Sequence, residues 1–124
     1  MADKIRVLII AGHPAVRAEM RTIFQLADGI EVAGEADSLS EAIRQGLALR
    51  PDVALVDLEM SGPQGSGYDV VAQLKTQRLA RSIVVLTAHD YPAARENAAR
   101  CGADAIIIKG ADFNTMLDVI RQNS

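Results

Sequence analysis

Residues 53–57 read Val53-Ala54-Leu55-Val56-Asp57, four aliphatic side chains followed at once by an acid. A short run of consecutive apolar residues, bounded by turn-forming residues, is typical of a strand that is buried on both faces of a sheet. Such strands belong to parallel sheets covered by helices on both sides. The stretch therefore predicts an α/β protein in which an acidic side chain stands at the carboxyl end of a strand.

The same pattern occurs three more times in the chain. Residues 83–86 precede Thr87, residues 105–108 precede Lys109, and residues 7–10 precede Ala11-Gly12-His13. Parallel strands end at one edge of their sheet, and ligands bind in the crevice beyond that edge. We therefore expect the carboxylate of Asp57, the hydroxyl of Thr87 and the ammonium of Lys109 to share one site.

Helical patterns separate these strands. One helix is expected from Pro14 to a stop at Gly29, and another from a cap at Ser38 or Ser40 to residues 50–51. Residues 92–100 form a further helix without a large aliphatic side chain, so we expect it to be weakly held. The apolar faces of the other helices are Val16, Met20, Ile23, Phe24 and Ala27; Leu39, Ile43 and Leu47; Val70, Val71 and Leu74; and Phe113, Met116, Leu117 and Ile120.

The order of these elements predicts the fold. Residues 30–36 form a fifth strand, which is less apolar than the others and is therefore expected at an edge. Five successive βα units with right-handed crossovers give a flavodoxin-like (βα)5 doubly wound sheet in strand order 2-1-3-4-5. In that order Asp57 and the turn at residues 11–13 lie at the switch point, where such folds bind ligands.

Length and composition narrow the class of protein. We expect the 124 residues to form one domain, and 49% apolar with 23% charged residues is ordinary for a soluble globular protein. Since the net charge is −3 and aromatic residues are only 3%, we expect no nucleic-acid binding through this domain. The longest apolar run is too short to span a membrane. The single cysteine, Cys101, allows no intrachain disulfide and fits a cytoplasmic protein.

The three side chains suit phosphoryl transfer. A carboxylate such as that of Asp57 can act as a nucleophile and take a phosphoryl group covalently. Phosphoryl transfer requires a protein mainly to position the reacting groups and to neutralise the charge on the phosphoryl oxygens. Lys109 would supply the positive charge and Thr87 a hydroxyl donor, while Mg²⁺ normally assists from one or two carboxylates.

Several motifs together resemble the receiver domains of two-component response regulators, in particular the subfamily with a helix-turn-helix output domain. They are residues 5–10 followed by His13-Pro14, residues 56–60, residues 85–88, and residues 102–104 continuing to Lys109-Gly110. The resemblance covers nearly the whole chain. It implies that Asp57 is the phosphoacceptor, Thr87 the switch hydroxyl and Lys109 the phosphate contact.

The resemblance also implies partners. A sensor histidine kinase or another phosphodonor would supply the phosphoryl group, and a downstream output domain or protein would respond, with a homodimer as one form of that response. No enzymatic activity is expected apart from self-phosphorylation and dephosphorylation at Asp57. Residues 1–124 would be either a free-standing receiver or the amino-terminal part of a longer regulator.

The chain departs from the family at the metal site. Ala11 and Gly12 stand where receivers carry two adjacent acids that bind magnesium. Asp57 and the backbone carbonyl of Glu59 remain as metal ligands, so we expect Mg²⁺ binding to be weakened by orders of magnitude, since one unit charge at 4 Å contributes about 4 kcal/mol at an effective dielectric of 20. In addition, Ile106 replaces a frequently aromatic residue, and the loop after Met60 is about two residues longer than usual.

Alternatives stay open at this point. Lys109 could form only a structural ion pair with Asp57, and the domain would then be a phosphorylation-independent binding or dimerisation module. The Glu59 side chain could replace a missing metal ligand, although an exposed loop side chain is the usual outcome. The glycine-rich loop at residues 61–67 matches no nucleotide-binding motif, which makes a flavodoxin-like small-ligand binder the least supported reading. His13 and Cys101 are interpreted as a loop residue and a packed residue.

Overall fold

Ten elements alternate along the chain in a computed structural model that describes residues 3–62 and 65–124. The strands are β1 (Ile5–Ile10), β2 (Ile30–Ala36), β3 (Val53–Asp57), β4 (Ser82–Thr87) and β5 (Ala105–Ile108). The helices are α1 (Pro14–Gln25), α2 (Leu39–Leu49), α3 (Gly67–Thr76), α4 (Pro92–Cys101) and α5 (Phe113–Gln122). Among the described residues, no helix is long and apolar enough to cross a membrane.

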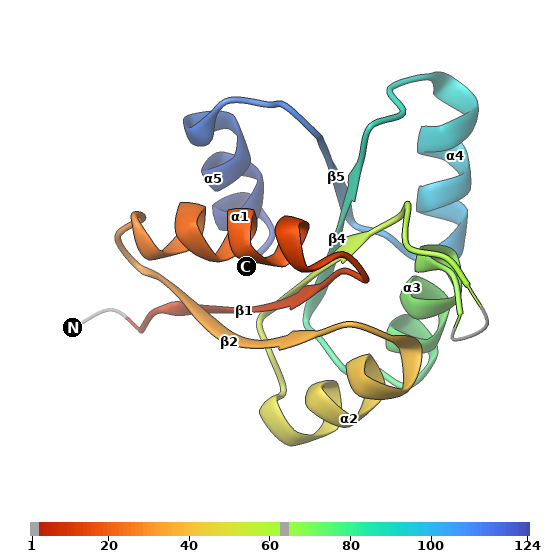
Figure 1. The fold of residues 1–124 in the computed structure, drawn as a ribbon, viewed down its shortest axis with the longest axis horizontal. Coiled ribbons are helices and arrows are strands. Elements are labelled where there is room, and N and C mark those ends of the chain that lie inside the picture. The colour runs from red at the N-terminus through yellow and green to blue at the C-terminus, as the bar shows by residue number, and fades with distance from the viewer. Residues whose placement is uncertain (1–2, 63–64) are drawn as a thin grey trace.

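The strands form one parallel sheet in the order β2-β1-β3-β4-β5, which confirms the predicted flavodoxin-like topology (Figure 1). Helices α1 and α5 cover one face, and α2, α3 and α4 cover the other. Successive side chains of β3 alternate between these layers: Ala54 and Val56 pack toward α3, and Val53 and Leu55 pack toward α1 and α5. The sheet thus separates two apolar cores.

Local chemistry explains where the helices begin and end. His13 caps α1, because its Nδ1 accepts a hydrogen bond of 3.1 Å from the Ala15 N–H. Ser38, rather than Ser40, caps α2 through the Glu41 N–H. Gly102 ends α4 in the left-handed conformation, as the sequence predicts for a glycine after a helix.

Two predicted apolar positions are wrong. Leu47 is 51% exposed, because the buried stripe of α2 is centred on Gly46, where an added Cβ would lie 2.9 Å from Leu79 Cβ. One residue further along, a helix has turned by about 100°, which carries Leu47 to the solvent side. Phe113 is 38% exposed at the first turn of α5.

Strand β2 lies at the edge of the sheet, as predicted, and its pairing with β1 contains a bulge. Val7 pairs with Val32, but Leu8 pairs with Gly34, so Ala33 is an extra residue on the edge strand. The bulge shifts the register at the middle of the strand while Ile10 and Ala36 still end side by side. The carboxyl ends of the strands therefore remain level at the edge where the site was predicted.

Candidate functional site

The three predicted site residues meet at the carboxyl edge of the sheet. Asp57 is the last residue of β3 and Thr87 the last of β4, and both are buried, with exposed fractions of 4% and 2%. Lys109 directly follows β5, and its backbone N–H donates a 2.8 Å hydrogen bond to the Thr87 carbonyl. The parallel register of β3, β4 and β5 therefore brings these side chains together, although Asp57 and Lys109 are 52 residues apart in the sequence.

Asp57 and Lys109 form an ion pair, with 3.0 Å between Asp57 Oδ1 and Lys109 Nζ. The same Oδ1 accepts a 2.9 Å hydrogen bond from the Glu59 N–H, which closes a tight turn after β3. The hydrogen bond and the ion pair both involve Oδ1 and neither involves Oδ2, on a side chain that is 6% exposed. Asp57 thus has one oxygen, Oδ1, held in place by two contacts.

Glu59 is an exposed residue of the turn after β3, as the sequence favours, but its carboxylate is turned toward the site. Its Oε1 accepts a 3.1 Å hydrogen bond from Thr87 Oγ1 and another from the Ala88 N–H, and it lies 3.8 Å from Lys109 Nζ. Thr87 Oγ1 itself accepts a 3.1 Å hydrogen bond from the His89 N–H. The hydroxyl proton of Thr87 is therefore directed at Glu59, and the site holds two carboxylates and one ammonium.

Gly67 is a residue of the site that sequence reasoning missed. An added Cβ would lie 2.6 Å from the Asp57 carbonyl oxygen and 2.6 Å from Leu58 Cα. The Gly67 N–H donates a 3.0 Å hydrogen bond to the Met60 carbonyl. Helix α3 can therefore begin directly against the turn that carries Asp57 only because residue 67 has no side chain.

The end of β1 is chemically different from the rest of the site. Ala11 is buried, Gly12 is exposed, and the Ala11 carbonyl accepts a 2.7 Å hydrogen bond from Arg17 Nη1. Among the described residues, no group of three His, Cys, Asp or Glu side chains could hold a metal ion. Asp57 and Glu59 supply two carboxylates, but Lys109 contacts both of them. This set of donors does not fit a dedicated magnesium site.

The remaining candidate residues have structural surroundings. Cys101 is partly buried against the core on the α3 side, in agreement with its interpretation as a packed residue. His89 is exposed, and its ring lies 5.8 Å from that of Tyr91. Of the glycine-rich loop, residues 63–64 lie outside the described residues, and the flexible connection expected there is not tested.

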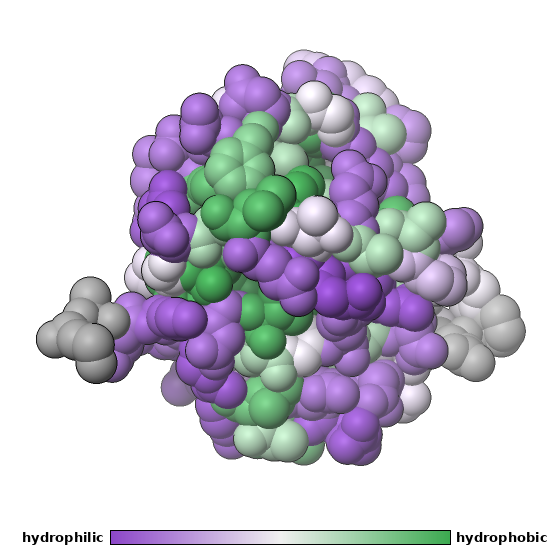
Figure 2. Space-filling view, turned by 60° about the vertical axis from the view of Figure 1, so that its left-hand side comes forward, coloured by the Kyte–Doolittle hydropathy of each residue, from purple (hydrophilic) through white to green (hydrophobic). Residues whose placement is uncertain are grey.

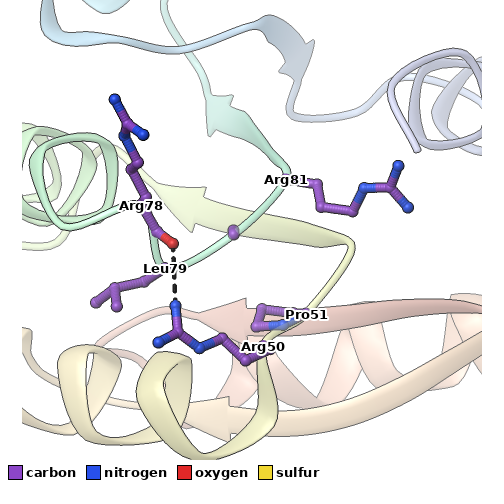
Figure 3. Close-up of a pocket in the computed structure, with 6 residues that line it drawn as sticks. Arg50, Pro51, Arg78, Leu79 and Arg81 are labelled. Carbon is purple, nitrogen blue, oxygen red and sulfur yellow. Dashed lines mark hydrogen bonds between the residues drawn. The ribbon is translucent and has the colours of Figure 1, made fainter.

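Two of the surface hollows, both away from Asp57, differ in character. One, of about 220 Å³, lies between α1 and α5 and extends to Lys109, on a face where Figure 2 shows an apolar patch among hydrophilic residues. The other, of about 120 Å³, lies at the opposite edge of the sheet near Arg50, Arg78 and Arg81. Figure 3 shows that the three side chains do not converge: Arg50 donates to the Arg78 carbonyl, and the other two extend outward. Arg50 is the C-cap of α2 and Arg78 directly follows the C-cap of α3, and a helix dipole favours cations near its carboxyl end.

Comparison with known proteins places this site in a family. A family model described as the response regulator receiver domain matches residues 7–121. The chain belongs to this family. The resemblance inferred from the sequence is thereby confirmed, and the receiver domain described here is a signalling module of the two-component type.

Proteins named as response regulators are similar to nearly the whole chain. A nitrate/nitrite response regulator protein homolog of Haemophilus influenzae is 32% identical over 98% of this chain, and the nitrate/nitrite response regulator protein NarP of Escherichia coli is 32% identical over 97%. The chain spans 58% and 55% of these two relatives' length. The solved receiver domain of the putative response regulator NarL from Mycobacterium tuberculosis is 29% identical, with a TM-score of 0.83, and the match covers 97% of this chain and 98% of that one.

Proposed function

We propose that this receiver domain accepts a phosphoryl group on Asp57 from a sensor histidine kinase or a small phosphodonor, with weakened magnesium binding. The observation that carries the proposal is the 3.0 Å contact between Asp57 Oδ1 and Lys109 Nζ, in which the second carboxylate oxygen takes no part. In the reaction Asp57 Oδ2 forms a bond to phosphorus as the bond from phosphorus to the donor breaks, and the leaving group takes the electron pair. Lys109 and Thr87 then donate to the phosphoryl oxygens.

The response to phosphorylation would be a change in a protein-binding surface. Thr87 and Lys109 both reach the site from the β4–β5 half of the sheet, so a phosphoryl group that draws them toward Asp57 acts on the segments after β4 and β5. The domain would work with a downstream output domain or protein, or as a homodimer, and residues 1–124 would be the receiver part of the regulator. Apart from self-phosphorylation and dephosphorylation at Asp57, it would not act as an enzyme.

A second candidate function is a phosphorylation-independent protein-binding module. It is favoured by Ala11 and Gly12 in place of acids and by the ion pair that already neutralises Asp57. In this case Lys109 serves only to balance a buried charge, and the partner would recognise the unmodified domain.

The two functions predict different masses after treatment with acetyl phosphate and magnesium. If Asp57 is the phosphoacceptor, the intact mass increases by one phosphoryl group, and the variant Asp57→Ala shows no increase. If the domain acts without phosphorylation, no increase occurs in either protein, and partner binding is unchanged in Asp57→Ala. The experiment refutes the first function if excess magnesium and phosphodonor produce no modified protein.

Weakened magnesium binding has a test of its own. Gly12 has room for a side chain, because an added Cβ would meet only Met60 Cβ at 3.7 Å and the Asp37 carbonyl at 3.9 Å. The double variant Ala11→Asp/Gly12→Asp should therefore lower the magnesium concentration needed for half-maximal phosphorylation by a factor of about 100 or more. The variant Ala11→Asn/Gly12→Asn is the uncharged control. An equal magnesium requirement in all three proteins would refute the weakened site.

A further inference from the structure

The carboxylate of Glu59 is held by three donor groups at the site. One oxygen, Oε1, is contacted by the Thr87 hydroxyl, by the Ala88 N–H and, at 3.8 Å, by Lys109 Nζ. These donors come from the ends of two strands, and the acceptor comes from the turn after a third. Residue 59 as a whole is exposed, whereas its side chain is 29% exposed, so the carboxylate lies at the rim of the site rather than deep inside it.

This donor set is suited to a phosphoryl oxygen. An ammonium, a hydroxyl and a backbone N–H that point to one spot stabilise a concentrated negative charge, because charge-assisted hydrogen bonds are about twice as strong as neutral ones. The spot lies beside Asp57, since Lys109 Nζ contacts Asp57 Oδ1 and Glu59 Oε1 together. A phosphoryl group attached to Asp57 would need the same donors.

We propose that Glu59 is a built-in occupant of the phosphoryl-binding site, an internal anion that holds Thr87 and Ala88 while Asp57 is unmodified. The inference deepens the proposed function, on which it rests for the identity of the competing ligand. It has two consequences. Glu59 competes with a phosphoryl group for its donors, and it keeps Thr87 turned toward the site when no phosphoryl group is present.

The turn sequence explains why Glu59 reaches these donors. The Glu59 N–H donates to Asp57 Oδ1, and the Met60 N–H donates to the Asp57 carbonyl at 3.3 Å. These two bonds curl the chain back over the end of β3, toward the neighbouring end of β4. The glutamate side chain has two methylene groups, which let its carboxylate reach Thr87. An aspartate side chain at this position would be one methylene shorter.

The first test measures the contacts in the unmodified protein by two-dimensional NMR. The variant Glu59→Ala removes the acceptor, so the Ala88 amide proton should move upfield, as expected for loss of a hydrogen bond to a carboxylate. Glu59→Gln keeps an oxygen acceptor without the charge and should give a smaller shift. The control Glu96→Ala removes an exposed carboxylate on α4, whose side chain is 73% exposed, and should leave Ala88 unchanged. An unchanged Ala88 signal in Glu59→Ala overturns the proposal.

The second test measures competition with a phosphoryl analogue. At saturating magnesium, trifluoroberyllate should bind Glu59→Ala about tenfold or more tightly than the unaltered protein, because a like charge has been removed from its immediate surroundings. Equal or weaker binding overturns the proposal. The proposed function is judged separately by phosphorylation with acetyl phosphate. Tighter trifluoroberyllate binding without any phosphorylation would refute that function while supporting the role of Glu59.

Discussion

At the scale of single residues, Gly67 connects the fold to the site. Helix propensity favours alanine over glycine by up to about 1 kcal/mol, so Gly67→Ala would stabilise α3 if the space were open. Instead the new Cβ would lie 2.6 Å from the Asp57 carbonyl oxygen and from Leu58 Cα, two backbone atoms that cannot rotate away. We therefore expect Gly67→Ala to lower the free energy of unfolding by about 2 kcal/mol.

Urea unfolding followed by circular dichroism measures this change. Gly12→Ala is the matched control, because its Cβ would meet Met60 Cβ at an ordinary 3.7 Å. If Gly67→Ala raised the free energy of unfolding, the turn after Asp57 and the start of α3 would have to be further apart than an approach of 2.6 Å allows.

The residues of the site differ in how far the sequence reveals them. Asp57, Thr87 and Lys109 each follow an apolar run directly, and strand ends that follow such runs share one edge of the sheet. Glu59 and Gly67 carry no such signal. The position of the Glu59 side chain depends on how the turn curls toward a different strand, and the requirement at Gly67 comes from a close approach of two backbone segments.

At the scale of elements, a salt bridge fastens α1 to β2. Arg21 Nε lies 2.5 Å from Glu35 Oε2, and the hydrogen bond from Arg21 holds the pKa of the Glu35 carboxyl below its usual value. Because the pKa is lower in the folded state, Glu35 stabilises the fold above its unfolded pKa, and this contribution disappears as the pH falls through the folded pKa.

We therefore expect Glu35→Gln to lower stability at pH 7 by about 0.5 kcal/mol, as for other partly exposed ion pairs. The difference from the unaltered protein should vanish in strong acid, where Glu35 is protonated in both states. Thermal unfolding at several pH values measures it, with Glu31→Gln on the same strand as the control, since that carboxylate is 48% exposed and 4.0 Å from Arg6. If Glu35→Gln were less stable than the unaltered protein by the same amount at low pH, the charge of Glu35 would not be the cause of the difference.

Helix α4 is expected from the sequence to be weakly held, and the structure gives it only small buried side chains. Its buried residues are Ala94 and Ala98, whereas α3 buries Val70, Val71 and Leu74. Burial of each additional methylene contributes about 0.8 kcal/mol. Hydrogen exchange at the backbone amides should therefore be faster in α4 than in α3 by a factor of 10 or more. Equal protection in the two helices would mean that α4 opens only when the whole domain unfolds.

At the scale of the whole molecule, the sheet separates two apolar cores, one on each face. Phe24 is fully buried in the core between α1 and α5, and Leu26, two residues later, is 73% exposed. Phe24→Ala should lower the free energy of unfolding by about 3 kcal/mol or more, and Leu26→Ala should change it by less than about 0.5 kcal/mol. Chemical unfolding of both variants checks the contrast, and similar losses would contradict the described orientation of α1.

The strand order and both helical layers could be predicted because they follow from apolar periodicity, crossover handedness and helix caps. The exceptions have a common physical cause. Leu47 and Phe113 match the helical period, but their exposure depends on which stripe of each helix is pressed against the sheet, and the small residue Gly46 decides this for α2. Periodicity indicates that a helix has an apolar side without fixing its rotation to within one residue.

The bulge at Ala33 has a consequence for how copies of this chain meet. An outer strand with a regular ladder can recruit strands from neighbouring molecules and lead to fibrils. On β2 the extra residue interrupts the spacing of amide and carbonyl groups, and Glu31 places a negative charge on the strand. Identical molecules would approach one another there with mismatched ladders and like charges. Polymerisation through the β2 edge of the sheet is thereby disfavoured.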